Sequence, residues 1–590
     1  MIELRIYRAA FLPAILAVVL VMFSLESRPG ALAQGLPADV VFGGSSSSVT
    51  AGRIVTAARD RRAGSVGDRR TAGLVAGAFR RQGFTVEVAR FRSHDRDLVN
   101  VVGRRAGKSR RQIVVVADRD ATGVPDAAGS ASDTAALMDL ARIFRGRPSS
   151  RTLVLASVDG GTLGEVGAAR LASSIGEPAL VDGVVVVSGL GYGGPDRPSV
   201  VSWSNDTARA GLRLQRTAVE SLRAEADAVA PRASAAGQLA RLSFPLGLGA
   251  QGVLLDQGYD AVRIAGGGER QDTSASRAGD IDRDRLGVGG RAVLRTVTAL
   301  DQARSPGEGP STYLTAVSQV MPGWVLSVLA LALILPALVA SVDAFARARR
   351  RRSAVAAWLA WLGAGVLAFV IGAGLAHFLD LVGAIDSPAA PVAPELSPLS
   401  AGPIAALALV ALATALAWVL LRRLARAADP DLREVAAPGA AVVLGLVLSL
   451  CTLVVWLVNP FSALIMVPAL HLWTLALLVD PLPGRRGRVA LVVGGLVLPA
   501  LLAVYELSIL SLDPLTGAWY LMLLVTGGHV GVLSALLGCV YAAVLGCMIS
   551  VVLSTPPEPR RPPREVPKVR GPATYAGPGS LGGTDSALRR

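Results

Sequence analysis

The chain has 590 residues, of which 52% are hydrophobic and only 17% are charged, and its formal net charge is +15. This length exceeds that of one ordinary domain, and the charged share lies below the roughly one quarter that is usual in soluble globular proteins. A mean hydropathy of +0.49 therefore predicts a membrane protein embedded in a lipid bilayer. All basic residues except Lys108 and Lys568 are arginine, and many of them cluster between apolar segments. This placement indicates membrane topology rather than a nucleic-acid partner.

The N-terminal segment combines features of a signal peptide and of a membrane anchor. Arg5 and Arg8 precede an apolar run over residues 9–25, and residues 31–33 are the small-residue sequence Ala-Leu-Ala of a cleavage site. The apolar run is nearly long enough to cross a bilayer. Residues 1–33 are therefore expected to form either a cleaved signal peptide or an uncleaved signal anchor, and both predict that the next segment is exported.

Residues 34–312 are predicted to form an exported α/β domain. This region contains no apolar stretch long enough to span a membrane, and short β-branched runs alternate with helical patterns. The predicted strands are Phe84–Phe91, Gln112–Ala117, Thr152–Ser157 and Val184–Val187. The predicted helices are Ala135–Phe144, Leu212–Ala228 and Leu286–Ala303. Alternation of this kind predicts a largely parallel sheet covered by helices on both faces.

Residues 321–553 are predicted to form an all-α, multi-pass transmembrane domain. The apolar segments are 321–341, 354–379, 400–421, 438–458, 460–479, 488–511 and 518–553. Each has the length needed to cross about 30 Å of hydrocarbon. The last is long for one crossing, and Gly527-Gly528-His529 divides it either into a short interfacial or re-entrant piece and a spanning helix, or into two crossings.

Basic residues in alternate loops predict the orientation of these helices, because cytoplasmic loops collect Lys and Arg. Arginines are concentrated after the first, third and fifth segments, at 347–352, 422–426 and 485–488. The tail 554–590 is also basic and rich in Pro and Gly, so it is predicted to be disordered and cytoplasmic. A cytoplasmic tail requires an odd number of crossings, which favours seven helices after the exported domain in a multi-pass protein of the cell membrane.

Five segments of the exported domain occur in the order and spacing of one known family. These segments are Arg62–Ser65, Asn100–Val102, Ile113–Asp120, Gly129–Arg142 and Leu153–Ala168. In this respect the domain resembles the M28 family of zinc-dependent aminopeptidases. The resemblance implies a site at the ends of the core strands, where two zinc ions are held by imidazole and carboxylate and a Glu acts as general base.

The residues at the family's metal-binding positions differ from those that the resemblance implies. The first His ligand falls on Asp118, the bridging Asp on Gly129, the Glu-Glu pair on Gly161 and Thr162, and the next Asp ligand near Ser188 or Gly189. No histidine occurs between His94 and His377 to supply the last ligand. Glycine offers no donor atom, so the resemblance predicts a peptidase fold without bound zinc and without peptidase activity.

Carboxylates remain near this site, and two interpretations of them stay open. Asp118 and Asp120 lie two apart at a predicted strand end, with Asp126 and Asp133 on nearby sequence. Together with water they could hold one hard cation. Alternatively, they cap a helix, occupy turns or pair with Arg119. The candidate residues of a vestigial binding cleft are Asp118, Asp120, Gly129, Asp133, Gly161, Thr162 and Ser188.

Three functions are compatible with this organisation. The first is a non-catalytic scaffold or binding subunit of a membrane assembly, which holds a protein or peptide partner in the old cleft. The second is a membrane-bound metallo-hydrolase with a site rebuilt around Asp118 and Asp120. The third is a transporter or lipid-handling protein, for which the ionisable candidates inside the helices are His471, Glu506 and His529.

Overall fold

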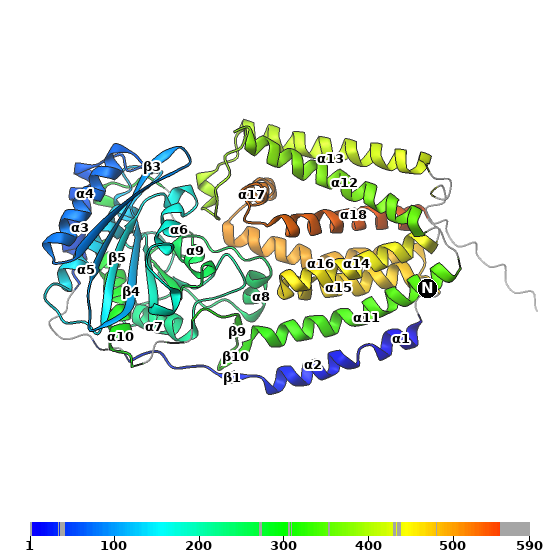
Figure 1. Ribbon diagram of the computed structural model, residues 1–590, viewed down its shortest axis with the longest axis horizontal. Helices are drawn as coiled ribbons and strands as arrows, with labels where there is room; N and C mark the ends of the chain where they lie inside the picture. Colours follow the sequence, from blue (N-terminus) through cyan, green and yellow to red (C-terminus); the bar gives the residue numbers. More distant parts are fainter. Residues whose placement is uncertain are drawn as a thin grey trace, which may run out of the picture.

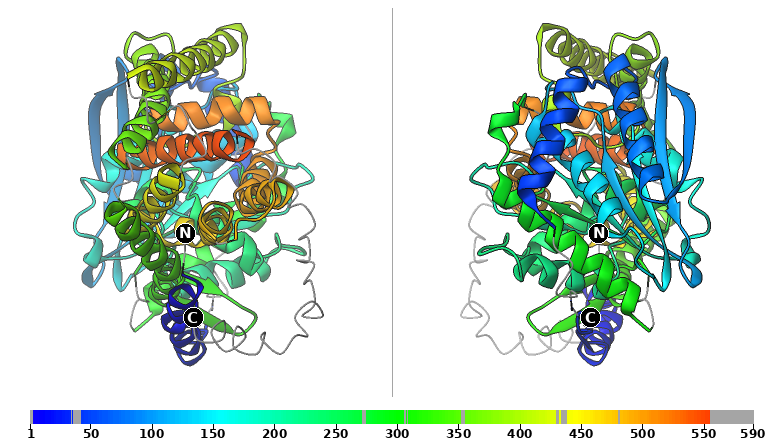
Figure 2. Two further views of the ribbon diagram at one scale, coloured as in Figure 1. Left: turned by 90° about the vertical axis from the view of Figure 1, so that its right-hand side faces the viewer. Right: turned by 90° about the vertical axis from the view of Figure 1, so that its left-hand side faces the viewer.

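The computed structural model describes residues 3–33, 35, 42–270, 274–304, 307, 309–351, 355–428, 432, 438–479 and 481–554. A sheet domain occupies one end of the molecule, and long apolar helices extend from it side by side (Figures 1 and 2). The predicted basic tail lies outside the described residues from position 555 onward.

The sheet domain is built on a seven-stranded mixed sheet with the strand order β2-β3-β5-β4-β6-β8-β7. The strands are β2 (Thr85–Ser93), β3 (Arg96–Arg105), β4 (Ser109–Asp118), β5 (Arg151–Val158), β6 (Val181–Ser188), β7 (Ser199–Val201) and β8 (Ala261–Ala265). The central strands β5, β4, β6 and β8 are parallel, whereas β2, β3 and β7 pair antiparallel at the two edges. The predicted parallel sheet is confirmed at its centre, and all four predicted strands are present.

Helices cover both faces of this sheet, as predicted. They are α3 (Gly44–Ala57), α4 (Val66–Arg81), α5 (Ser132–Ile143), α6 (Val166–Ala172), α7 (Leu212–Arg223), α8 (Ala235–Ser243), α9 (Ala250–Asp256) and α10 (Arg283–Gln302). α5 lies on the face away from the membrane helices, whereas α6 and α9 lie on the face toward them (Figure 1). α7 ends at Arg223, five residues before the predicted end. The core of β4, which includes Val114, Val115 and Val116, is fully buried between these layers.

Eight helices among the described residues are long and apolar enough to cross a membrane. One, Arg5–Phe23, covers α2 (Leu12–Phe23) and all but the first residue of α1 (Leu4–Ala9), and it precedes the sheet domain. The other seven are α11 (Gly323–Arg350), α12 (Val355–Leu381), α13 (Ala401–Ala428), α14 (Pro438–Val458), α15 (Pro460–Leu478), α16 (Arg485–Leu510) and α18 (Val532–Ser554). They establish the second domain as an all-α region of membrane-spanning character.

The long segment 518–553 consists of two helices of unequal length. α17 (Pro514–Thr526) has 13 residues and precedes the 23-residue α18. α17 lies beside the sheet domain and is seen end-on in Figure 1, so it runs across the direction of α11 and α13. Its length is too short for a crossing, and its position matches the interfacial alternative.

The N-terminal helix packs along α11 as a part of the bundle. Ala14 and Ala17 are buried against Ala332, and these small side chains let the two helices approach closely. The Tyr7 hydroxyl lies 2.7 Å from Nδ1 of His471 on α15. After α2, β1 (Glu26–Ser27) pairs with β10 (Gln319–Pro322), which also pairs with β9 (Tyr313–Thr315).

These contacts predict that residues 1–33 are retained as an anchor. Cleavage after Ala33 would remove α1, α2 and β1 together, and it would expose Ala332 and leave the β1-facing edge of β10 unpaired. Intact-protein mass spectrometry of the purified chain is expected to give a mass that includes these residues. A mass corresponding to a chain that begins near Gln34 would contradict the prediction.

Candidate functional site

The predicted cleft residues converge at the carboxyl ends of the central parallel strands, where open α/β sheets usually bind ligands. A cavity of about 60 Å³ is lined there by 15 residues, six of which belong to the predicted set. These six are Asp118, Asp120, Gly129, Asp133, Thr162 and Ser188. The seventh, Gly161, lies directly beside Asp118, because a Cβ at this position would be 2.9 Å from the Asp118 Cγ. We call this group the carboxylate cleft.

Arg119 separates the two aspartates and points into the core rather than into the cleft. Its Nε and Nη2 donate to the two carboxylate oxygens of Asp68 over 2.8 and 2.7 Å. The remaining donors bind the Val99 carbonyl at 2.7 Å and the Ser157 carbonyl and hydroxyl at 3.2 and 3.3 Å. Both side chains of the Arg119–Asp68 pair are fully buried, so the guanidinium links β4 to α4, β3 and β5.

Asp120 is used as an acceptor for the backbone of the turn that follows β5. Its Oδ1 accepts from the amides of Gly160 and Gly161, each at 2.9 Å. Its Oδ2 accepts from the amide and the hydroxyl of Thr162, at 3.0 and 2.6 Å. Burial raises the pKa of Asp120, and the Thr162 hydrogen bonds counteract that shift. The carboxylate thus holds a turn and presents no free oxygen to the cleft.

Asp133 and Asp126 likewise accept hydrogen bonds from the backbone of loops around the cleft. Asp133 lies in the first turn of α5 and accepts from the amides of Gly189 and Leu190 at 2.7 and 2.9 Å. Burial raises its pKa to about 8, although these two hydrogen bonds oppose the shift. Asp126 accepts from the amide of Gly129 at 3.1 Å and from the hydroxyl of Tyr192 at 2.8 Å.

Asp118 has a different environment, which it shares with two residues that sequence reasoning missed. Its Oδ1 is buried and has no hydrogen-bond partner among the described residues, and the same holds for Oε2 of Glu165. Burial, followed by the charge of Asp120, raises the pKa of Asp118 to about 7. Burial also raises the pKa of Glu165, while the fully buried Arg263 of β8 counteracts both shifts.

Two features concealed these residues in the sequence. Glu165 follows the glycine-rich turn and adopts a left-handed backbone with φ of 59°, which a sequence pattern does not predict for glutamate. Arg263 occupies the middle of β8, where a charged residue interrupts the apolar run. The one signal in the sequence was an arginine in the middle of an apolar run, which indicates a buried charge that needs acidic neighbours.

The donor atoms of the cleft do not fit a pair of zinc ions. Gly129 and Gly161 contribute none, and both oxygens of Asp120 are engaged by the turn. Among the described residues, no group of three or more His, Cys, Asp or Glu side chains is arranged to hold a metal ion. Zinc sites need three or four such ligands, so no water-activating step can be derived for this arrangement.

A loop between α12 and α13 covers the carboxylate cleft. Leu396 of this 382–400 loop lines the cavity together with Asp118 and Asp120. The loop backbone at Ala389 and Ala390 lies so close to Gly164 that a Cβ there would be 2.9 Å from both amide nitrogens.

The 382–400 loop is held in turn by α17. The Tyr520 hydroxyl donates to the Val392 carbonyl at 2.8 Å, and Trp519 Nε1 donates to the Ser397 carbonyl at 3.0 Å. The hydroxyls of Ser387 and Thr526 are 2.6 Å apart. The membrane domain therefore contributes one wall of the cleft.

The two histidines among the ionisable candidates inside the helices have structural partners, whereas Glu506 has an unpartnered oxygen. His471 contacts Tyr7 through Nδ1, and its Nε2 lies 2.9 Å from the Leu333 carbonyl. His529 Nε2 lies 2.9 Å from the Pro245 carbonyl of the sheet domain. Glu506 is buried at the end of α16 beside the sheet domain, where one carboxylate oxygen has no partner among the described residues. The histidine contacts join helices to one another and to the sheet domain.

Comparisons with known proteins concern the sheet domain. No protein-family model and no curated protein matches the chain. Among solved structures, it is similar to the glutaminyl cyclase of an Acidobacteriales bacterium, with 17% identity, a TM-score of 0.34, and 46% of this chain and 99% of that chain covered. It is likewise similar to a zinc aminopeptidase from Bacillus subtilis, with 12% identity and a TM-score of 0.34, and the match covers 46% of this chain and 98% of that chain. It is also similar to the LapA aminopeptidase of Legionella pneumophila, with 13% identity and a TM-score of 0.38, and the match covers 46% of this chain and 76% of that chain.

Gly129 is a test of how the cleft is packed. A Cβ there would lie 2.4 Å from the Tyr192 hydroxyl and about as close to both oxygens of Asp126. We expect Gly129→Ala to destabilise the protein by about 1–3 kcal/mol, as overpacking of a filled core does. Thermal unfolding of the purified full-length chain measures this effect.

Gly73→Ala is the matched control, because nothing lies within 4 Å of a Cβ at this exposed position of α4. Alanine is the better helix former, so this variant is expected to unfold at the same or a slightly higher temperature. Equal unfolding temperatures for the two variants would show that the space at Gly129 is not filled.

Proposed function

We propose that the chain is a multi-pass membrane protein whose sheet domain is a non-catalytic binding module that scaffolds a membrane assembly. The proposal rests on one observation above all. The carboxylates of Asp120, Asp126 and Asp133 accept hydrogen bonds from backbone amides of the loops around the cleft. An enzyme of the kind that the sequence resembles needs such groups free to bind metal and substrate.

The size and cover of the cleft support the same proposal. A cavity of about 60 Å³ is far smaller than the roughly 300–1,000 Å³ of ordinary ligand sites. A neighbouring cavity of about 220 Å³ shares Ala121, Thr122, Thr162 and Leu396 with it, and its other lining residues include His94 and Asp386. The segment that occupies the mouth of the cleft is therefore the protein's own 382–400 loop. In this proposal the carboxylate cleft is the surface through which the sheet domain binds the membrane domain.

We further propose that the sheet domain lies outside the cytoplasm. By connectivity, the arginines at the end of α11 and at the start of α16 lie at the end of the bundle away from the sheet domain (Figure 1). Cytoplasmic segments are enriched in such residues. The opposite end, where the 382–400 loop meets the sheet domain, would then face the exterior.

A second candidate is a hydrolase with a rebuilt site, and the unpartnered oxygens of Asp118 and Glu165 favour it. Buried carboxyl groups with raised pKa values, such as Asp118 in the cleft and Glu165 near it, are a typical feature of acid–base sites. The same two groups also face Arg263, which supplies a structural reason for their burial. The two candidates differ in whether Asp118 takes part in turnover.

Metal content and peptidase activity of the full-length protein distinguish these candidates. After incubation with zinc and desalting, the purified chain is expected to retain no stoichiometric zinc, because the cleft lacks ligands. It is also expected to show no turnover of a panel of aminoacyl-p-nitroanilides. Elemental analysis by mass spectrometry and the absorbance assay provide the two measurements.

Asp118→Asn and Asp95→Asn form a matched pair for this experiment, because Asp95 has a side chain that is 98% exposed and lies on the β2–β3 turn. If the native chain turns substrate over and only Asp118→Asn abolishes the activity, the second candidate is correct. Stoichiometric zinc with turnover in the native chain would refute the non-catalytic proposal.

A further inference from the structure

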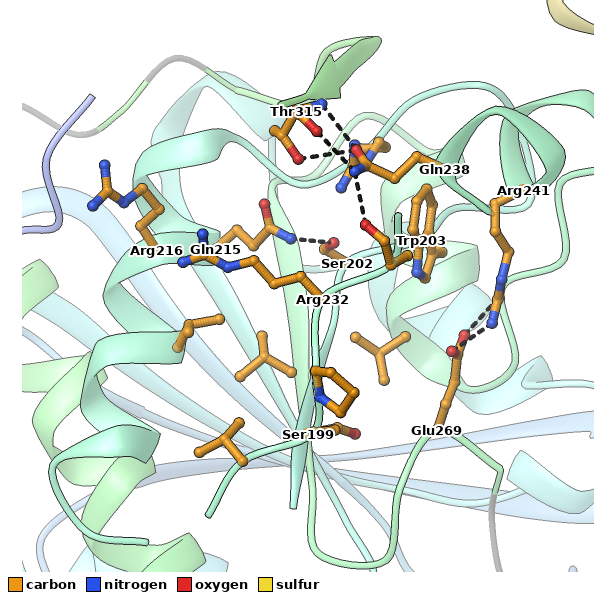
Figure 3. A pocket seen from close by; sticks show the side chains of 18 of the residues that line it. Ser199, Ser202, Trp203, Gln215, Arg216, Arg232, Gln238, Arg241, Glu269 and Thr315 are labelled. Atoms are coloured by element: carbon orange, nitrogen blue, oxygen red, sulfur yellow. Dashed lines mark hydrogen bonds and ion pairs between the residues drawn. The ribbon is translucent and has the colours of Figure 1, made fainter. Parts of the chain in front are cut away.

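A second, larger cavity lies where the sheet domain meets the membrane helices. It has a volume of about 380 Å³ and is lined by residues of β7, α7, α8, β9 and the end of α16. Six arginines contribute to its lining: Arg28, Arg209, Arg216, Arg223, Arg232 and Arg241. Figure 3 shows the cavity with Arg216 and Arg232 on one side and Arg241 on the other. We call it the arginine pocket.

The positive charge of this pocket is largely uncompensated. Glu269 is the one acidic residue in the lining, and it forms a bidentate pair with Arg241 over 2.7 and 2.5 Å. Outside the lining, Glu220 pairs with Arg223 at 3.0 Å. No carboxylate among the described residues pairs with the other four arginines.

Arg209 forms the fixed back wall of the pocket. Its guanidinium is stacked between the rings of Trp203 and Tyr313, 4.3 Å from each centroid. Nη1 donates to Gln238 Oε1 and to the Tyr313 carbonyl, both at 2.9 Å. Arg209 is only 3% exposed and its Nε has no partner among the described residues. A buried cation with an unused donor is costly, and an anion placed near the guanidinium offsets the cost of its charge.

Arg28, Arg216 and Arg232 form a like-charge cluster at the mouth. Burial, followed by the charges of Arg232 and Arg216, lowers the pKa of Arg28. Burial, followed by the charges of Arg223 and Arg216, lowers the pKa of Arg232. The Nε atoms of Arg28 and Arg216 are buried without a partner among the described residues. Repulsion within the cluster would be relieved by an anion placed among the guanidinium groups.

The pocket lies at the level where three candidate membrane helices begin or end. Arg28 follows α2, Thr315 precedes α11, and Tyr505 and Ile509 belong to the last two turns of α16. Trp324, at the first turn of α11, is 56% exposed. Exposed tryptophan at a helix end is typical of the headgroup region of a bilayer. The arginine pocket is thus within reach of lipid phosphates as well as of solutes.

We propose that the arginine pocket is a binding site for a phosphate group, carried either by an anionic lipid or by a soluble phosphate compound. Guanidinium groups bind phosphate oxygens through paired, charge-assisted hydrogen bonds. The volume of about 380 Å³ exceeds the needs of a bare ion and accommodates a headgroup or a small phosphate ester. This inference does not depend on whether the carboxylate cleft is catalytic.

The test uses the full-length protein purified in detergent and phosphate-free buffer, with two probes. Inorganic phosphate is titrated by calorimetry, and native mass spectrometry measures retention of phosphatidylglycerol against phosphatidylcholine with identical acyl chains. Specific binding in the first experiment identifies a soluble phosphate as a sufficient ligand. Preferential retention of phosphatidylglycerol without binding of inorganic phosphate identifies the lipid headgroup.

Arg216→Gln combined with Arg232→Gln is expected to weaken whichever binding is observed by about tenfold or more, because two charge-assisted contacts are lost. The matched control is Arg80→Gln with Arg81→Gln, which removes the same charge from exposed positions on α4, far from the membrane helices (Figure 1). Arg232→Gln alone changes one exposed side chain and keeps the test decisive if the double variant does not fold.

Three results would overturn the proposal. One is the absence of specific binding with both probes. Another is native affinity in the folded double variant, or in folded Arg232→Gln if the double variant does not fold. The third is an equal loss of affinity in the Arg80 and Arg81 control, which would show that the effect comes from net charge and not from the pocket.

Discussion

The fully buried guanidinium of Arg119 is the interaction on which the sheet domain depends. A charge of this kind costs several kcal/mol to remove from water, and complete hydrogen bonding offsets much of that cost. Here Asp68, the Val99 carbonyl and Ser157 use all of its donors, so α4, β3 and β5 are fixed relative to β4. Asp118 and Asp120, on either side of Arg119 in the chain, line the carboxylate cleft instead.

Three carboxylates of the cleft hold the loops around it by hydrogen bonds to backbone amides. Asp120 positions the turn after β5, Asp133 positions the segment after β6, and Asp126 positions the start of the segment that leads into α5. Carboxylates around such a cleft can bind a metal or hold the backbone, and all three accept hydrogen bonds from backbone amides here. The arrangement leaves a cavity of only about 60 Å³, and Leu396 of the 382–400 loop lines it.

Much of the fold could be predicted because apolar runs dominate it. β4, β5 and β6 are short valine- and leucine-rich strands, and the membrane helices are long apolar segments, so periodicity and length identify both. The sequence did not predict β8, because Arg263 interrupts its apolar run. It did not predict β7 either, because three residues are too few to show a hydrophobic periodicity. The seven cleft residues came from motif order, whereas contacts between distant segments have no local signal. Leu396 over the cleft and Arg28 in the arginine pocket are such contacts.

Amide hydrogen exchange at Gly160, Gly161 and Thr162 measures whether Asp120 orders the turn after β5, because its carboxylate accepts from these amides. We expect strong protection in the native chain that is the same in zinc and in chelator, and that is lost in Asp120→Ala. Exchange that is fast in chelator and slow only with zinc would contradict this expectation, since a metal would then order the turn.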